Sequence, residues 1–138
     1  MESSGFNISA DELAARRSSS TQIIYESRNG YCRIYATDFN GRRIALKALK
    51  PEYADSDVHI YLLRKEYEIG HSLYHPYIAS TIGFRSFPGI GPVIVMELVD
   101  GLTLRDYIDS KGPLPQKEAM AIVEELCDAL EYLHYHSR

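Results

Sequence analysis

The sequence predicts an α+β fold, in which an antiparallel five-stranded sheet with one packed helix is followed by two further helices. Two observations carry this prediction. Short alternating apolar segments fill the first half of the chain, and apolar residues at helical spacing fill residues 116–136. The 138 residues suffice for one modest core, and 45% hydrophobic with 25% charged residues is typical of a soluble globular protein.

Composition argues against several classes of partner. The net charge of −4 gives no electrostatic reason to expect nucleic acid. No apolar run approaches the ~20 residues of a membrane-spanning helix, and the polar N-terminus has no secretory signal, so we expect no membrane partner. The two cysteines, Cys32 and Cys127, lack metal-ligand spacing, and we expect them to be reduced in a cytoplasmic protein.

Residues 1–20 are predicted to be a polar leader and linker, after which three antiparallel strands open the sheet. Each strand is rich in β-branched or aromatic residues, and turn residues separate it from the next. Asn40-Gly41 is a strong hairpin signal between the second and third strands. The predicted strands are residues 21–25, 32–39 and 42–49.

The third strand carries a lysine on a partly buried face. Strict alternation places Ala45, Lys47 and Leu49 on one face of the sheet. An ammonium group on such a face needs a counter-charge. The alternative is a lysine on an edge strand whose stem reaches water, and this strand alone leaves both interpretations open.

A helix is predicted over residues 57–74, and it supplies the counter-charge. Glu66 falls on a stripe of apolar residues at helical spacing that we expect to face inward. A carboxylate within an apolar stripe also needs a partner. The simplest solution is that Lys47 and Glu66 meet. The apolar residues of this stripe are Leu62, Ile69 and Leu73.

This strand and helix resemble two elements of protein kinases. Ile44-Ala45-Leu46-Lys47 is similar to the V-A-I-K strand of that family. Glu66 precedes His75-Pro76-Tyr77-Ile78, which is similar to the H-P-N-I turn after the kinase helix that carries the paired glutamate. The resemblance implies that Lys47 and Glu66 form the ion pair that supports nucleotide binding, in a kinase N-lobe-like sheet.

The turn over residues 27–34 stands where the family has its glycine-rich loop, G-x-G-x-x-G-x-V. Here Ser27-Arg28-Asn29-Gly30-Tyr31-Cys32-Arg33-Ile34 replaces all three pattern glycines. Glycine lets a backbone approach phosphates and adopt positive φ, so the departure predicts a weaker phosphate grip. A plain β-hairpin is the alternative. The residues that the resemblance implies for cofactor binding here are Ser27, Asn29, Gly30 and Ile34.

A fourth strand is predicted within residues 77–86, and the apolar run at residues 93–96 predicts a fifth strand that is buried on both faces. The segment that follows resembles the kinase hinge between the two lobes. The resemblance implies that Met96 guards the adenine pocket and that the backbone of Glu97 and Val99 bonds the adenine edge. Ala45 completes the implied ATP-binding residues. A core strand that ends in a glycine turn is the alternative.

Two further helices are predicted over residues 102–110 and 116–136, and they resemble the first two helices of the kinase C-terminal lobe. The resemblance divides the chain into an N-lobe-like domain over residues 21–100 and an incomplete C-lobe over residues 101–138. We expect the apolar face of the last helix to bind a protein partner or a second copy. The residues predicted to face inward in the first helix are Leu104, Tyr107 and Ile108. The apolar stripe of the second helix is formed by Ala119, Ile122, Val123, Leu126, Leu130 and Leu133, and Ala129 widens it.

Two short motifs look catalytic but do not fit the family pattern. Leu104-Arg105-Asp106 lacks the histidine of H-R-D and lies on a predicted helix, and Asp38-Phe39-Asn40 precedes Lys47 although D-F-G follows it in kinases. We therefore assign no catalytic residue beyond the supporting Lys47–Glu66 pair, and no metal ligand. The resemblance implies ATP as the cofactor, with Mg²⁺ expected only in a complete parent kinase.

The function predicted from these features is the N-terminal part of a Ser/Thr protein kinase-like protein. Its ATP-binding lobe is expected to support phosphoryl transfer only in a complete parent, and these 138 residues alone are expected to be inactive. The alternative is a non-catalytic, pseudokinase-like interaction module. A small-molecule phosphotransferase of the kinase-like superfamily fits less well, because the His75-Pro76 turn and the hinge favour a protein kinase.

Overall fold

The computed structural model describes residues 21–136, which form two compact units. The first unit contains residues 21–72 and 80–98, and the second contains residues 73–79 and 99–136. The predicted leader at residues 1–20 lies outside the described residues. Among residues 21–136, none of the helices has the length and apolar content that crossing a bilayer requires.

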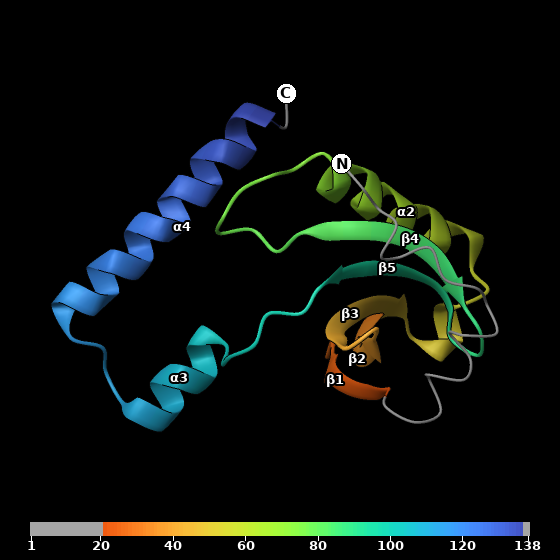
Figure 1. The fold of residues 1–138 in the computed structure, drawn as a ribbon, viewed down its shortest axis with the longest axis horizontal. Helices are drawn as coiled ribbons and strands as arrows, with labels where there is room; N and C mark the ends of the chain where they lie inside the picture. Colours follow the sequence, from red (N-terminus) through yellow and green to blue (C-terminus); the bar gives the residue numbers. More distant parts are fainter. Residues whose placement is uncertain (1–20, 137–138) are drawn as a thin grey trace. The chain divides into compact units, whose positions relative to one another are not determined.

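The first unit is a five-stranded antiparallel sheet with one helix packed on it, as the sequence predicts (Figure 1). The order β1-β2-β3-β5-β4 places β3 at the centre. Both residues of the turn between β2 and β3, Asn40 and Gly41, have positive φ angles of 49° and 76°, as a two-residue hairpin of type I′ requires. The strands are β1 Gln22–Glu26, β2 Cys32–Phe39, β3 Arg42–Leu49, β4 Thr81–Phe87 and β5 Gly91–Glu97.

Apolar side chains fill both faces of this sheet. Val93, Ile94 and Val95 in β5 are all buried, which confirms the prediction of a strand covered on both sides. One cluster lies on the face of the sheet that points away from the helix. It contains Phe39, Ile44, Leu46, Ala48, Phe87, Val93 and Val95. The other lies beneath the helix and contains Leu49, Leu63 and Ile94.

Helix α2 (Asp57–His71) covers this second cluster and packs against β3, β4 and β5. Ser56 caps its N-terminus, where the hydroxyl oxygen accepts from the backbone N–H of His59. The helix ends at His71 and not at the predicted residue 74. At this end, the Ser72 hydroxyl donates to the carbonyl of Ile69, which satisfies one of the free carbonyls of the last turn.

The face of α2 that packs on the sheet differs from the predicted one. Leu63 is 1% exposed, whereas Leu62 and Ile69 are 40% and 61% exposed, so the prediction that these two face inward was wrong. The helix carries apolar residues on two sides, and spacing alone does not distinguish them. Glu66 lies one turn after Leu63, near enough to the packed side to reach the sheet.

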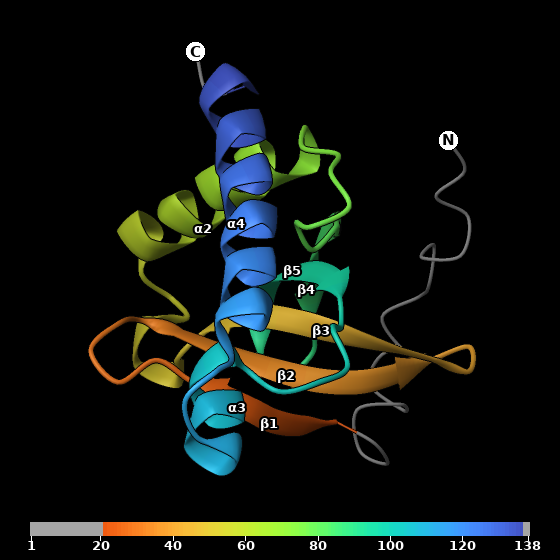
Figure 2. The same cartoon turned by 90° about the vertical axis from the view of Figure 1, so that its left-hand side faces the viewer.

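The second unit contains helices α3 (Leu104–Lys111) and α4 (Gln116–His136) (Figure 2). Tyr107 joins them, because its hydroxyl donates to Glu118 Oε1 at 2.6 Å and accepts from Lys111 Nζ at 2.8 Å. This hydrogen bond to Tyr107 raises the pKa of Lys111. Leu104 and Ile108 were expected to face inward, but they are 45% and 38% exposed.

The loop at residues 73–79 is fastened to α4. The backbone N–H of Tyr74 donates to Tyr132 Oη at 2.6 Å, and the ring of His75 lies 5.1 Å from that of Tyr132. His75 Nδ1 accepts from the backbone N–H of Tyr77, so a neutral His75 carries its proton on Nε2. This nitrogen lies 3.7 Å from a carboxylate oxygen of Asp128.

Candidate functional site

The candidate site is built around an ion pair between the central strand and the helix. Nζ of Lys47 in β3 donates to Oε2 of Glu66 in α2 at 2.5 Å. The Lys47 side chain is 26% exposed and that of Glu66 is 46% exposed, so water screens the attraction. Such a pair contributes at most about 1 kcal/mol to the free energy of unfolding. Its main effect is to fix the position of the ammonium group.

Strand register places an apolar surface beside this ammonium group. Ile34 in β2 is directly opposite Lys47, and Met96 in β5 is directly opposite Ala45. Directly paired residues point to the same face of a sheet, as do residues two apart along one strand. Ile34, Ala45, Lys47 and Met96 therefore share one face. A positive charge next to a flat apolar surface suits a ligand that has an anionic part and an aromatic part.

The turn between β1 and β2 is a closed hairpin. Its ends meet where the N–H of Ser27 donates to the carbonyl of Cys32 at 3.1 Å. A Cβ atom on Gly30 would lie 2.3 Å from Ser27 Oγ, so a larger residue here would require the Ser27 side chain to move. Neither Gly30 nor Asn29 is among the described residues with positive φ. Asn29 is exposed at the tip.

Cys32, in place of the third pattern glycine, puts a side chain on the face that carries Lys47. Burial raises the pKa of its thiol; Lys47 lowers it and Glu66 raises it. The thiol therefore stays protonated at neutral pH, and it packs as an apolar group beside Leu49 and Leu63. The sequence indicates Cys32 only as a departure from a pattern, and it gives no sign of this packing.

Glu97 ends β5, and Val99 follows two residues later. The N–H of Glu97 donates to the carbonyl of Ser80 at 2.9 Å, and the Glu97 side chain accepts from the N–H of Ser80 at 2.8 Å. The backbone N–H of Glu97 is thus already used, which leaves its carbonyl as the group that a ligand would meet. Val99 belongs to the second unit, and its side chain is exposed. The ligand-binding roles of both residues remain predictions.

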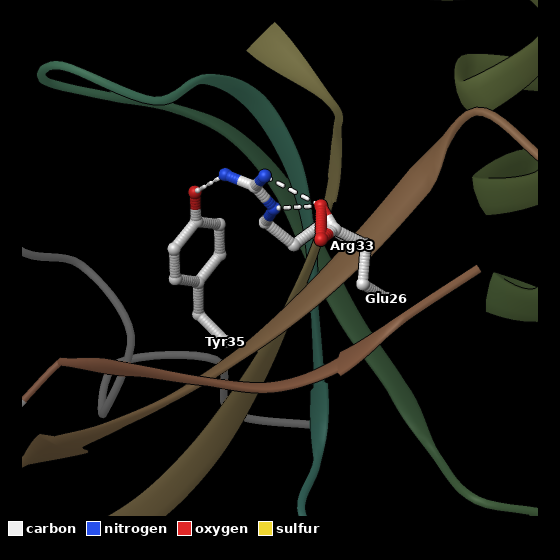
Figure 3. Close-up of polar contacts among 3 residues, drawn as sticks. All are labelled: Glu26, Arg33 and Tyr35. Carbon is white, nitrogen blue, oxygen red and sulfur yellow. Dashed lines mark hydrogen bonds and ion pairs between the residues drawn. The ribbon is translucent and has the colours of Figure 1, made fainter. Parts of the chain in front are cut away.

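A charged brace on the other face of the sheet holds the two strands of the hairpin together (Figure 3). Nε and NH2 of Arg33 donate to the same carboxylate oxygen of Glu26, at 2.8 and 2.5 Å, and NH1 donates to Tyr35 Oη at 3.3 Å. The hydrogen bonds to Tyr35 and Glu26 raise the pKa of Arg33, so the brace stays charged. Sequence reasoning missed it, although Glu26 directly precedes the predicted turn and Arg33 lies within that turn.

No metal site accompanies this arrangement within the described range. Among residues 21–136, no three His, Cys, Asp or Glu side chains gather closely enough to hold an ion. The acidic residue nearest to Lys47, Glu66, is engaged with its ammonium group.

Comparison with known families gives one match that covers most of the chain. Residues 26–137 match the family described as "Protein kinase domain". The serine/threonine-protein kinase PrkC of Bacillus subtilis is 39% identical over 93 residues, which cover 67% of this chain and 14% of PrkC. The serine/threonine-protein kinase PknB of Mycobacterium leprae is 36% identical over 96 residues, covering 67% of this chain and 15% of PknB. The chain thus spans about a seventh of these relatives.

Solved structures give the same result at the level of the fold. The kinase domain of Mycobacterium tuberculosis PknI matches with a TM-score of 0.62 and 28% identity, covering 83% of this chain and 46% of that domain. Rad53 in complex with AMP-PNP matches with a TM-score of 0.64 and 22% identity, covering 86% of this chain and 31% of the Rad53 chain. Both likenesses extend over both units of the chain but over less than half of the matched protein.

Proposed function

Because the chain belongs to the protein kinase family, we propose that its first unit is the nucleotide-binding part of a Ser/Thr protein kinase-like protein and binds ATP on the face that carries Lys47. The observation that supports this most is the 2.5 Å contact between Lys47 Nζ and Glu66 Oε2 on a face shared with Ile34, Ala45 and Met96. The relatives that are named as Ser/Thr kinases support serine and threonine as the residues that accept the phosphoryl group.

In this proposal each part of ATP meets a different part of the site. The Lys47 ammonium group bonds phosphate oxygens while Glu66 holds it in place. Ile34 and Ala45 pack on the base, and Met96 closes the back of the pocket. The carbonyl of Glu97 bonds the adenine edge, and Ser27, Asn29 and Gly30 lie over the phosphates.

Phosphoryl transfer itself is proposed for the parent protein, since the chain spans 14% of PrkC and 46% of the PknI kinase domain. Mg²⁺ would neutralise charge on the phosphates in a complete kinase. The proposal includes a cytoplasmic location, which the free thiols of Cys32 and Cys127 support.

A thermal shift experiment tests ATP binding. A non-hydrolysable ATP analogue at 100 times its Kd is expected to raise the free energy of unfolding by about 2.7 kcal/mol, and therefore to raise Tm by several degrees. Tripolyphosphate at the same concentration is the control for charge alone, and we expect a smaller shift because it lacks the base. An unchanged Tm at millimolar analogue would contradict the proposal.

The alternative function is a non-catalytic interaction module. Two observations favour it: Gly30 lies close to the Ser27 side chain, and Cys32 puts a side chain where the pattern has glycine. The same experiment decides between the two functions. No shift with any nucleotide, together with a tight and saturable protein partner, would favour the interaction module.

We also propose that the exposed face of α4 binds a protein partner or a second copy. Val123, Leu126 and Leu130 are each more than half exposed along one side of this helix. Sedimentation velocity is expected to show association that rises with concentration and that L126E/L130E reduces at least several-fold. Glu131→Gln, beside the stripe, is the control. A chain that stays monomeric and well folded at high concentration would contradict self-association.

A further inference from the structure

Three aromatic rings meet between the turn that joins β1 to β2, the short helix before α2 and the start of α2. The Tyr31 ring centroid lies 5.0 Å from that of His59, at an interplanar angle of 67°. Tyr53, in the short helix η2 (Pro51–Tyr53), lies 4.5 Å from His59 and 6.5 Å from Tyr31. These edge-to-face and tilted arrangements are favourable for aromatic pairs. The rings come from three separate segments, which the cluster joins.

Hydrogen bonds reinforce each corner of the cluster. The carbonyl of Tyr31 accepts from the N–H of Lys50 at 2.8 Å, which fixes the turn to the end of β3. The N–H of Tyr53 donates to the carbonyl of Lys50 at 2.9 Å, so η2 starts from the same residue. The Ser56 hydroxyl, which caps α2, also lies 2.7 Å from His59 Nδ1 and orients that ring.

We propose that Tyr31, Tyr53 and His59 form an aromatic latch that makes the turn at residues 27–31 and the first turn of α2 open and close together. His59 is on the first turn of α2, and Glu66 is two turns further along the same rigid helix. Tyr31 also packs against the cluster of Leu49 and Leu63, so its ring cannot leave without exposing apolar surface. The latch therefore links the position of the turn to that of the residue that holds Lys47.

A consequence for ligands follows from this linkage. A ligand that lifts the turn must separate Tyr31 from His59 and so loosen the start of α2. A ligand that leaves the turn in place keeps the helix ordered. The three rings lie within the first unit, and the experiment that tests their linkage uses no nucleotide. The linkage can therefore be disproved while the proposed ATP binding holds, and ATP binding can be disproved while the linkage holds.

Amide hydrogen exchange on the 138-residue chain tests the latch, because two amides report on its two sides. The Lys50 N–H is bonded to the Tyr31 carbonyl and reports on the turn, while the Ile60 N–H is bonded to the Ser56 carbonyl and reports on the first turn of α2. Tyr31→Ala is expected to speed exchange at both amides by about 2- to 13-fold, the range that corresponds to one aromatic pair.

Reciprocal and control variants complete the test. His59→Ala should speed exchange at Lys50, which it does not touch, and Tyr31→Phe should leave both rates as in the wild type. Tyr25→Ala, at an exposed tyrosine of β1, is the matched control. The exchange rate of the Leu46 amide in the core must stay as in the wild type in every variant. If Tyr31→Ala does not fold, Tyr31→Leu takes its place. Faster exchange at Lys50 alone, or at neither amide, would overturn the proposal.

Discussion

Replacing Lys47 by methionine is expected to lower the affinity of the chain for an ATP analogue by about 10- to 150-fold. Methionine keeps much of the length of the side chain but removes the charge that would bond phosphate. A hydrogen bond to a charged group contributes about 1.5–3 kcal/mol, which corresponds to this range. Isothermal titration of the wild type and the variant measures the ratio of their Kd values. The loss of folding stability should be small, because the Lys47–Glu66 pair is partly exposed.

Lys65→Met is the matched control for Lys47→Met. It also replaces a lysine by methionine, but at an exposed position on α2. The Lys65 ammonium group lies 3.6 Å from the carboxylate of Glu68, and both side chains are 52% exposed. We expect its affinity for the analogue to stay within about twofold of the wild type, because exposed pairs interact weakly with their surroundings. Equal affinities of the wild type and Lys47→Met would remove the basis for the proposed site.

Leu63→Ala is expected to destabilise the first unit by about 2–5 kcal/mol, the usual loss for a buried leucine whose removal leaves a cavity. Leu63 is 1% exposed and is the buried side chain that α2 contributes to the core. Urea unfolding measures the loss. The free energy of unfolding of a small domain is about 5–15 kcal/mol, so this single change removes a large share of the stability.

Leu62→Ala provides a control with the same side chain at the neighbouring position. Leu62 is 40% exposed and faces away from the sheet, so its truncation should cost less than about 1 kcal/mol. If the two variants lost equal stability, α2 would pack through the side that the sequence first suggests, and the observed face would be in error.

Local patterns predicted much of the fold. Alternation located the central strands, and in the observed register Leu46 of β3 is paired with Tyr35 of β2 and Ala45 with Ala36. Asn40-Gly41 predicted a hairpin because few other dipeptides adopt two positive φ angles in succession. The requirement that a charge on a partly buried face be neutralised led from Lys47 to Glu66, which are 19 residues apart in sequence.

The predictions that were wrong concern which side of a helix packs, and this depends on the neighbours that the helix meets in the fold. Apolar spacing shows that α2 is amphipathic, but Leu62 and Leu63 are equally apolar, and only the position of the sheet decides which is buried. The inward face of α3 failed for the same reason. The aromatic latch could not be predicted, because Tyr31 and His59 come together only after the strands pair and η2 turns the chain.

The placement of residues 73–79 affects how this protein can be divided. These residues belong to the second unit, while the segments on either side of them belong to the first, so the chain crosses between the units at residues 72/73, 79/80 and 98/99. A cut or a stop codon near residue 98 would strand this loop without Tyr132, its partner on α4. Because Tyr74 and Tyr132 are 58 residues apart in the sequence, linear order is a poor guide to where the molecule can be split.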